Sequence, residues 1–153
     1  NDVSLQGDLE VLPAAGVIYN STAFDCQGTI TLNDTNSTSN SFIQFNANTA
    51  ISGGGTIFLG GSGNDSQVFT NSTTLTVTPG FTIEGSGEIS GSVINNGLIR
   101  AFPTTNGNGR IRLFSNAKTN NAEILADAGG VIEVTGHQRG HADQADQRQP
   151  LDV

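Results

Sequence analysis

The acidic side chains are the groups in this sequence best suited to chemistry, and their spacing argues against catalysis. Cleavage of a polysaccharide needs clustered carboxylates for acid/base or metal work, often with a basic residue nearby. Glu84 and Glu88 are close in sequence, and we group Arg100, Arg110 and Arg112 as basic residues on one face. No Asp-x-Asp pair and no histidine–acid pair completes such a site. The acids are scattered: Asp25, Asp34, Asp65, Glu84, Glu88, Glu123, Asp127 and Glu133. We therefore predict that the chain is not an enzyme.

Candidate metal ligands are equally dispersed. Residues 33–41 and 60–66 are rich in Asn, Asp and Ser oxygens, but neither segment fits a defined calcium loop. His137 and His141 are four residues apart, and no third ligand accompanies them. The sequence predicts no metal site and no cofactor.

Composition limits the classes of partner. The net charge is −8 and only 13% of the residues are charged. A nucleic-acid binder needs clustered Lys and Arg, so we expect none. No apolar stretch approaches the ~20 residues that span a bilayer. Cys26 is alone, which excludes an internal disulfide and leaves a buried small side chain or an intermolecular bond.

One pattern recurs along the chain: a small residue, then aliphatic residues two and four positions later. Five copies occupy residues 28–32, 55–59, 73–77, 109–113 and 130–134, and a weaker sixth copy occupies residues 91–95. The starts are separated by 27, 18, 18, 18 and 21 residues. A repeat of about 20 residues is typical of stacked units that bury their apolar sides against one another.

The period of two predicts short strands whose aliphatic residues point inward. The inward pairs are Ile30/Leu32, Ile57/Leu59, Leu75/Val77, Ile111/Leu113 and Ile132/Val134. Helical periodicity is absent up to residue 136. We predict an all-β fold, a parallel β-solenoid (β-helix) of about six rungs over residues 1–136, followed by a polar tail or cap over residues 137–153.

A second motif pairs two asparagines with an Ile and an Ala, at residues 95–101 and 120–126. If Asn95 and Asn120 occupy equivalent corners, their side chains form an inward amide ladder that satisfies backbone groups. We therefore take both as structural residues.

These Asn-Asn-Gly-x-Ile-x-Ala and Gly-x-Ile-x-Leu units resemble the β-solenoid repeats of bacterial surface proteins, of the autotransporter-passenger and filamentous-adhesin kind. The resemblance covers most of residues 28–136 and, less clearly, residues 3–27. It implies a parallel β-helix at the cell surface or in the matrix, with a binding or scaffolding role and no catalytic residue.

The leading hypothesis is an extracellular structural or adhesive module that associates with itself head to tail into filaments or a surface layer. The N-terminal segment alternates apolar and polar residues, so Val3, Leu5, Leu9 and Val11 are the expected self-association residues. Surface glycans are a further expected partner.

Two alternatives remain open. One is a β-helix that binds or cleaves carbohydrate. The other is an ice-binding solenoid, suggested by the pairs Thr29/Thr31 and Thr74/Thr76. Five Asn-x-Ser/Thr sequons begin at Asn20, Asn33, Asn36, Asn64 and Asn71, and would matter only in a host that glycosylates them.

Overall fold

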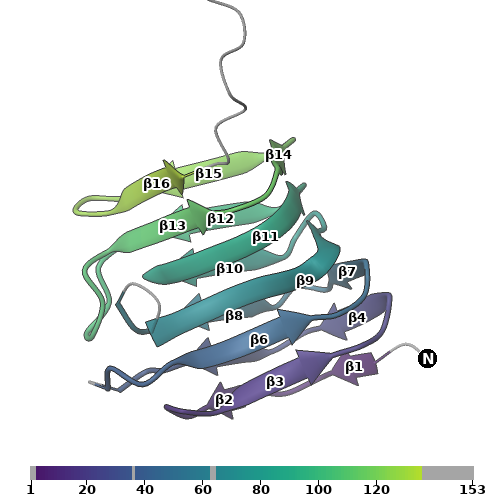
Figure 1. Ribbon diagram of the computed structural model, residues 1–153, viewed down its shortest axis with the longest axis horizontal. Coiled ribbons are helices and arrows are strands. Elements are labelled where there is room, and N and C mark those ends of the chain that lie inside the picture. Colours follow the sequence, from purple (N-terminus) through teal and green to yellow (C-terminus); the bar gives the residue numbers. More distant parts are fainter. Residues whose placement is uncertain (1–2, 36, 63–64, 136–153) are drawn as a thin grey trace, which may run out of the picture.

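The computed structural model describes residues 3–35, 37–62 and 65–135, which form β-strands stacked one above another (Figure 1). Sixteen strands form two sheets of ten and six strands, and no α-helix is present in these segments. Strand pairs within both sheets are parallel, from the first rung to the last. The predicted all-β parallel β-solenoid is confirmed.

The six-stranded sheet is the first face of the solenoid and contributes one strand to each rung. Its strands, in stacking order, are β2 (Leu9–Val11), β5 (Thr29–Leu32), β8 (Thr56–Leu59), β10 (Thr82–Gly85), β12 (Leu98–Ala101) and β15 (Glu123–Ala126). Six strands mark six rungs, or five complete turns, in agreement with the number expected from the repeats.

The ten-stranded sheet supplies two further faces. The second face holds β3 (Gly16–Tyr19), β6 (Ser41–Phe45), β13 (Arg110–Phe114) and β16 (Val131–Thr135). The third face holds β1 (Val3–Leu5), β4 (Ala23–Cys26), β7 (Thr49–Ser52) and β14 (Lys118–Asn120). Two long strands, β9 (Ser66–Val77) and β11 (Gly87–Asn95), run across both faces and join them into one sheet.

The long strands bend where they pass from the second face to the third. Ser72 in β9 has a φ of 59° and Gly91 in β11 has a φ of 92°. The register between the strands shifts between Ser90 and Ser92 at the same place. These positive φ angles turn the chain without interrupting the strand.

The core is built from columns of side chains that repeat from rung to rung. On the first face, in-register pairing stacks one isoleucine on another through five rungs: Ile30, Ile57, Ile83, Ile99 and Ile124. The first four are at most 1% exposed. β-Branched side chains suit this arrangement because a strand surface accepts their restricted rotamers. We call these five residues the isoleucine column.

The inward pairs predicted from the sequence are confirmed for the four inner copies, whose aliphatic residues are at most 2% exposed. The last copy differs. Val134 stacks on Leu113 in register, yet it is 66% exposed. It occupies an inward position at the end of the stack, where no described strand covers it.

Consecutive copies of the repeated pattern do not all lie on one face of the solenoid. Residues 28–32 stack on 55–59 on the first face, residues 73–77 on 91–95 on the third, and residues 109–113 on 130–134 on the second. Any of the three strands in a rung can carry the motif, because each strand needs the same inward pair. The true steps along the first face, from Thr29 to Thr56, Thr82, Leu98 and Glu123, are 27, 26, 16 and 25 residues.

Glycine precedes three of the six strands of the first face, β5, β8 and β12, where successive rungs approach closely. A Cβ atom on Gly55 would lie 2.4 Å from the carbonyl oxygen of Gly28. A Cβ atom on Gly28 would lie 2.2 Å from the carbonyl oxygen of Gly7. Steric contact with the neighbouring rung therefore requires glycine at positions 28 and 55.

We expect Ile57→Ala to lower the free energy of unfolding by about 2–5 kcal/mol, because it opens a cavity in the middle of the isoleucine column. The matched control is Thr56→Ala on the same strand, whose side chain points outward and whose loss should cost less than about 1 kcal/mol. Urea titration followed by circular dichroism measures both. Equal losses for the two variants would contradict the inward assignment.

Candidate functional site

Both ends of the stack present unpaired strand edges. At one end β1, β2 and β3 pair only with β4, β5 and β6. At the other end β14, β15 and β16 pair only with β11, β12 and β13. Figure 1 shows these two groups at opposite ends of the stack. Within the described segments, six strands therefore carry free N–H and C=O groups along one edge, and such edges favour pairing with another chain.

Exposed apolar side chains gather at the same two ends. Every large hydrophobic residue that is exposed in the described segments lies in the first rung or in the last two: Val3, Leu12, Ile18, Phe114, Leu125, Val131 and Val134. The exposed fraction reaches 56% at Leu12 and Ile18 and 66% at Val134. Val3 and Val134 continue inward columns, whereas Ile18, Phe114, Leu125 and Val131 point outward from their strands.

The four residues expected to mediate self-association lie in the first of these end groups. Val3 and Leu5 are on β1 and continue the columns of Phe24 and Cys26. Leu9 and Val11 are on β2 and continue the columns of Ile30 and Leu32. Val3 is 45% exposed, Leu5 and Leu9 are half-buried, and Val11 is buried. Leu12 and Ile18, which are not among the residues expected from the sequence, are also exposed in this end group.

At each end the three strands with an unpaired edge belong to the three faces in the same chain order. At the first end β1, β2 and β3 belong to the third, first and second faces. At the other end β14, β15 and β16 belong to the third, first and second faces as well. A second copy placed on the stack would therefore set β1 on β14, β2 on β15 and β3 on β16. Leu9 would then extend the isoleucine column beyond Ile124.

A strip of two outward columns runs along the second face. Strand register fixes the first column as Gly16, Phe42, Gln67, Glu88, Arg112 and Glu133, and the second as Ile18, Gln44, Phe69, Ser90, Phe114 and Thr135. We call these two columns the outer strip. Its first three rungs carry no charged side chain, and its last three rungs carry ion pairs.

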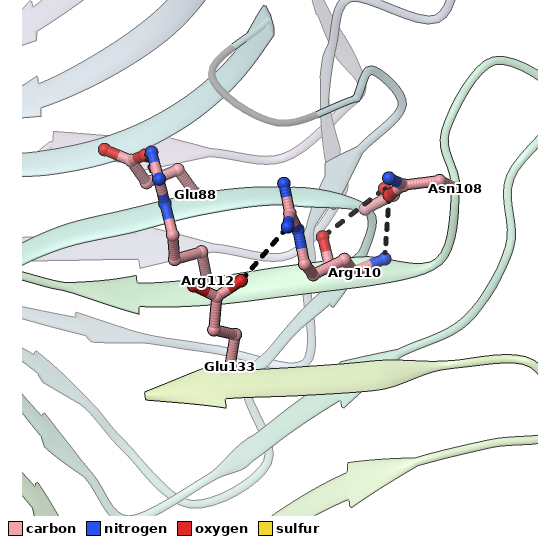
Figure 2. A network of polar contacts seen from close by, with 6 residues as sticks. Glu88, Asn108, Arg110, Arg112 and Glu133 are labelled. Carbon is pink, nitrogen blue, oxygen red and sulfur yellow. Dashed lines mark hydrogen bonds and ion pairs between the residues drawn. The ribbon is translucent and has the colours of Figure 1, made fainter. Parts of the chain in front are cut away.

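The ion pairs connect successive rungs of the outer strip, as Figure 2 shows. Arg112 donates from Nε to Oε2 of Glu88 at 3.0 Å, and a terminal N–H of Arg112 contacts the same oxygen. Glu88 is only 5% exposed. Arg110 pairs with Glu133 at 3.1 Å, and its backbone N–H donates to Oδ1 of Asn108. Arg112 also lies over the ring of Phe114, 5.0 Å from its centroid.

The structure separates two groups of residues that the sequence placed together. Arg110 and Arg112 share the second face, but Arg100 lies on β12 of the first face, so the single basic face was wrong. Glu84 and Glu88 also diverge, because Gly85 and Ser86 form a corner between their strands. Arg100 contacts Glu84 at 3.6 Å and donates to Asp127 at 2.7 Å. Each carboxylate is thus paired with an arginine of its own face.

Asn95 and Asn120 occupy equivalent positions on β11 and β14. The Nδ2 group of Asn95 donates to Oδ1 of Asn120 at 2.7 Å and to the backbone carbonyl of Glu123 at 2.9 Å. Its Oδ1 accepts from the backbone N–H of Gly97 at 3.1 Å. Asn95 is 1% exposed, whereas Asn120 is exposed in the last turn. The stabilising role of the pair stays a prediction.

Lys118 lies at the bend between β13 and β14, close to a ring of backbone oxygens. Its ammonium donates to the carbonyls of Phe114 at 2.8 Å and Ser115 at 3.1 Å, and it also contacts those of Gly91 and Asn116. Burial lowers the pKa of Lys118 to about 8, and the negative charge of Glu88 opposes this shift. The ammonium thus satisfies carbonyl oxygens at this bend, although burial disfavours its charge.

Asn33 begins a sequon, but its side chain has a structural role. It has a φ of 50° and is fully buried, and its Nδ2 group donates to the carbonyls of Ser37, Ser39 and Asp65. This amide is inaccessible to a glycosylating enzyme in the folded chain. Asn20 and Asn71 are exposed, and Asn36 and Asn64 lie outside the described residues.

The remaining candidate residues do not converge on a site. Cys26 is fully buried, its Sγ contacts the carbonyl of Gly28, and burial raises the pKa of its thiol. Among the described residues no group of three His, Cys, Asp or Glu side chains is placed to hold a metal ion. His137 and His141 lie outside the described residues, as does the expected polar tail.

The threonine pairs lie on different faces. Thr29 and Thr31 belong to the first face, where Thr29 stacks on Thr56, Thr56 stacks on Thr82, and Thr31 stacks on Phe58. Thr74 and Thr76 belong to the part of β9 on the third face. They therefore do not form one ladder.

The described residues form a parallel β-solenoid whose first and last strands each have one unpaired edge among those residues. Comparison of the chain with protein-family models, curated proteins and solved structures gave no match. In the described part of the chain, no helix has the length and apolar character needed to cross a membrane.

We expect Asn95→Leu to lower the free energy of unfolding by about 1–3 kcal/mol, because it removes the buried side-chain hydrogen bonds to Gly97 N–H and Glu123 C=O. Asn120→Leu should also destabilise the fold, but less, because Asn120 is exposed. Asn121→Leu is the control, since its amide bonds only Asn96 at the surface. Thermal unfolding ranks the three variants. An unchanged Tm for Asn120→Leu would count against the amide ladder.

The titration of Lys118 tests the burial of its amine. Lys118 is the only lysine, so dimethylation with ¹³C-formaldehyde gives one lysine resonance, which we expect to titrate with a pKa of about 8. The folded pKa lies below the unfolded value of 10.5, so the unfolded chain binds more protons between these pH values. This group alone therefore makes the free energy of unfolding rise with pH across that window. A titration at 10.5 would show the amine to be solvated.

Proposed function

We propose that this chain is an extracellular structural or adhesive module that associates end to end through its open rungs. The observation that carries the proposal is the match between the two ends. Both expose three strand edges in the same order of faces, and both expose aliphatic residues that continue inward columns.

The end rungs carry the same kinds of backbone edge and inward aliphatic side chain as the middle rungs. Each inner rung satisfies its backbone groups and its aliphatic side chains with the rungs on either side. Among the described residues, the first and last rungs lack one of these neighbours. A second copy supplies the missing rung through parallel strand pairing, as already occurs inside the chain.

Such a contact is heterologous, because the two surfaces that meet are different. A heterologous contact that does not close on itself produces a filament. The filament would be a continuous solenoid in which the outer strip of one copy leads into that of the next. This geometry suits a fibre or a layer that displays a repeating surface.

Location at the cell surface or in a matrix rests on two other considerations. Asn, Ser, Thr and Gly supply the polarity of the chain, a composition common in secreted proteins. The repeat units resemble those of bacterial surface β-solenoids, which display binding surfaces outside the cell. The proposed role is structural and adhesive and involves no catalytic step.

Two complementary blocked variants test the association. Val3→Lys/Leu12→Lys places charges on the first end, and Val134→Lys/Val131→Lys places them on the other, since lysine on an edge discourages pairing. The control Thr56→Lys/Thr76→Lys adds the same charge in the middle rungs. Analytical ultracentrifugation and electron microscopy report the size of the assemblies.

We expect filaments for the unmodified chain and the control, and monomers for each blocked variant alone. An equimolar mixture of the two blocked variants should form dimers and nothing longer, because only one open end of each type remains. Monomers of the unmodified chain at all concentrations would overturn the proposal. Filaments from either blocked variant would also overturn it.

A further inference from the structure

Most phenylalanines of this chain lie outside its core. Of the eight, Phe24, Phe45 and Phe81 are buried. The other five lie on outward positions or corners and are partly exposed: Phe42, Phe58, Phe69, Phe102 and Phe114. Phe102 and Phe114 each receive an arginine, and Phe58 lies beside Phe102. Among the aromatic and cationic groups of the described residues, Phe42 and Phe69 contact only each other.

Phe42 and Phe69 belong to a four-residue arrangement at the centre of the second face. Phe42 and Gln44 point outward from β6, and Gln67 and Phe69 point outward from β9. Register places Gln67 beside Phe42 and Phe69 beside Gln44, so rings and amides alternate along both strands and across them. The ring centroids are 5.4 Å apart. We call these four residues the aromatic–amide patch.

We propose that the aromatic–amide patch binds a neutral polysaccharide by stacking sugar rings on Phe42 and Phe69 and by hydrogen bonding their hydroxyl groups to Gln44 and Gln67. This inference is independent of the end-to-end association, because the patch lies between the two ends.

The side-chain amides of Gln44 and Gln67 retain hydrogen-bond donors and acceptors for such a ligand. A glutamine amide has two donor hydrogens and an oxygen that accepts two bonds. In the described segments the Gln67 side chain makes no hydrogen bond, and Gln44 uses only its Nε2 group, which donates to Asn46. Donors and acceptors therefore stand free beside both rings. A sugar matches this pattern because its ring offers an apolar C–H face bordered by hydroxyl groups.

The rings provide a rigid platform. A Cβ atom on Gly16 would lie 2.1 Å from Cζ of Phe42, so the ring of Phe42 covers the glycine of the adjacent rung. Phe69 packs against that ring at an interplanar angle of 50°. Contacts on both sides of Phe42 limit its motion, which lowers the entropy lost when a ligand binds.

Charge selects a neutral ligand over an ionic one. None of the four patch residues is charged, and residues 1–99 contain no Lys or Arg. The nearest acid along the outer strip, Glu88, is already bound by Arg112. An acidic polymer would meet a chain of net charge −8 with no cation at the patch.

The topology argues against a peptide as the ligand. An added peptide strand needs a free sheet edge. Here β6 is paired with β3 and β9 on its two sides, and β9 is paired with β6 and β11. Recognition at this patch must therefore use side chains alone.

Affinity gel electrophoresis tests the proposal on the full chain, with galactomannan, xyloglucan, dextran or, as the acidic polymer, alginate in the gel. We expect the protein to migrate more slowly in a gel that contains at least one of the neutral polysaccharides. Alginate should not slow its migration. Gln67→Ala/Phe69→Ala should weaken that binding at least ~10-fold, or ~1.4 kcal/mol. Phe58→Ala, a matched outward phenylalanine on the first face, should bind as the unmodified chain does. Circular dichroism checks the fold of each variant.

The blocked variant Val3→Lys/Leu12→Lys should also bind, which separates this site from the end-to-end contact. Four results would overturn the inference: no retardation in any neutral polysaccharide, equal retardation of the patch variant, preferential binding to alginate, or binding of a proline-rich peptide without binding of a glycan. Phe42→Ala provides a second patch variant if Gln67→Ala/Phe69→Ala does not fold.

Discussion

The structure depends on one constraint: each rung must find its aliphatic partners in the rungs beside it. A single rung of short strands is too small to enclose a core. The isoleucine column satisfies this need on the first face, where in-register parallel pairing places Ile30, Ile57, Ile83 and Ile99 on top of one another. The same register aligns backbone N–H and C=O groups between rungs. Side-chain packing and strand pairing therefore favour the same stacking, and a shift by one residue would turn the isoleucines outward.

The ends follow from the same constraint. In the described part of the chain two rungs have one neighbour each, and the exposed large hydrophobic residues gather in those end regions. Val134 illustrates the effect, since it occupies an inward position and remains 66% exposed. The end-to-end association that we propose would place such residues in the environment that equivalent residues have in the middle.

Outward positions are free of this requirement, so their chemistry varies along the stack. The outer strip changes from aromatic rings and amides to ion pairs between Glu88 and Arg112 and between Arg110 and Glu133 (Figure 2). The outer column of the first face contains Thr31, Phe58, Glu84 and Arg100 in successive rungs. The repeat thus fixes an interior and leaves the exterior available for recognition. Neutral glycan binding would use one part of that exterior.

The sequence by itself determined the class of fold and most of the interior. A period of two with aliphatic pairs such as Ile57/Leu59 requires a strand with one buried side, whatever its neighbours are. The matching Asn-Asn motifs likewise indicated that Asn95 and Asn120 occupy equivalent positions. Only the tertiary structure decided which face each strand joins, because all three strands of a rung need the same inward pair and the corners between them vary in length. For that reason the structure separates Glu84 from Glu88 and Arg100 from Arg112, and brings Phe42 beside Gln67 from the next rung.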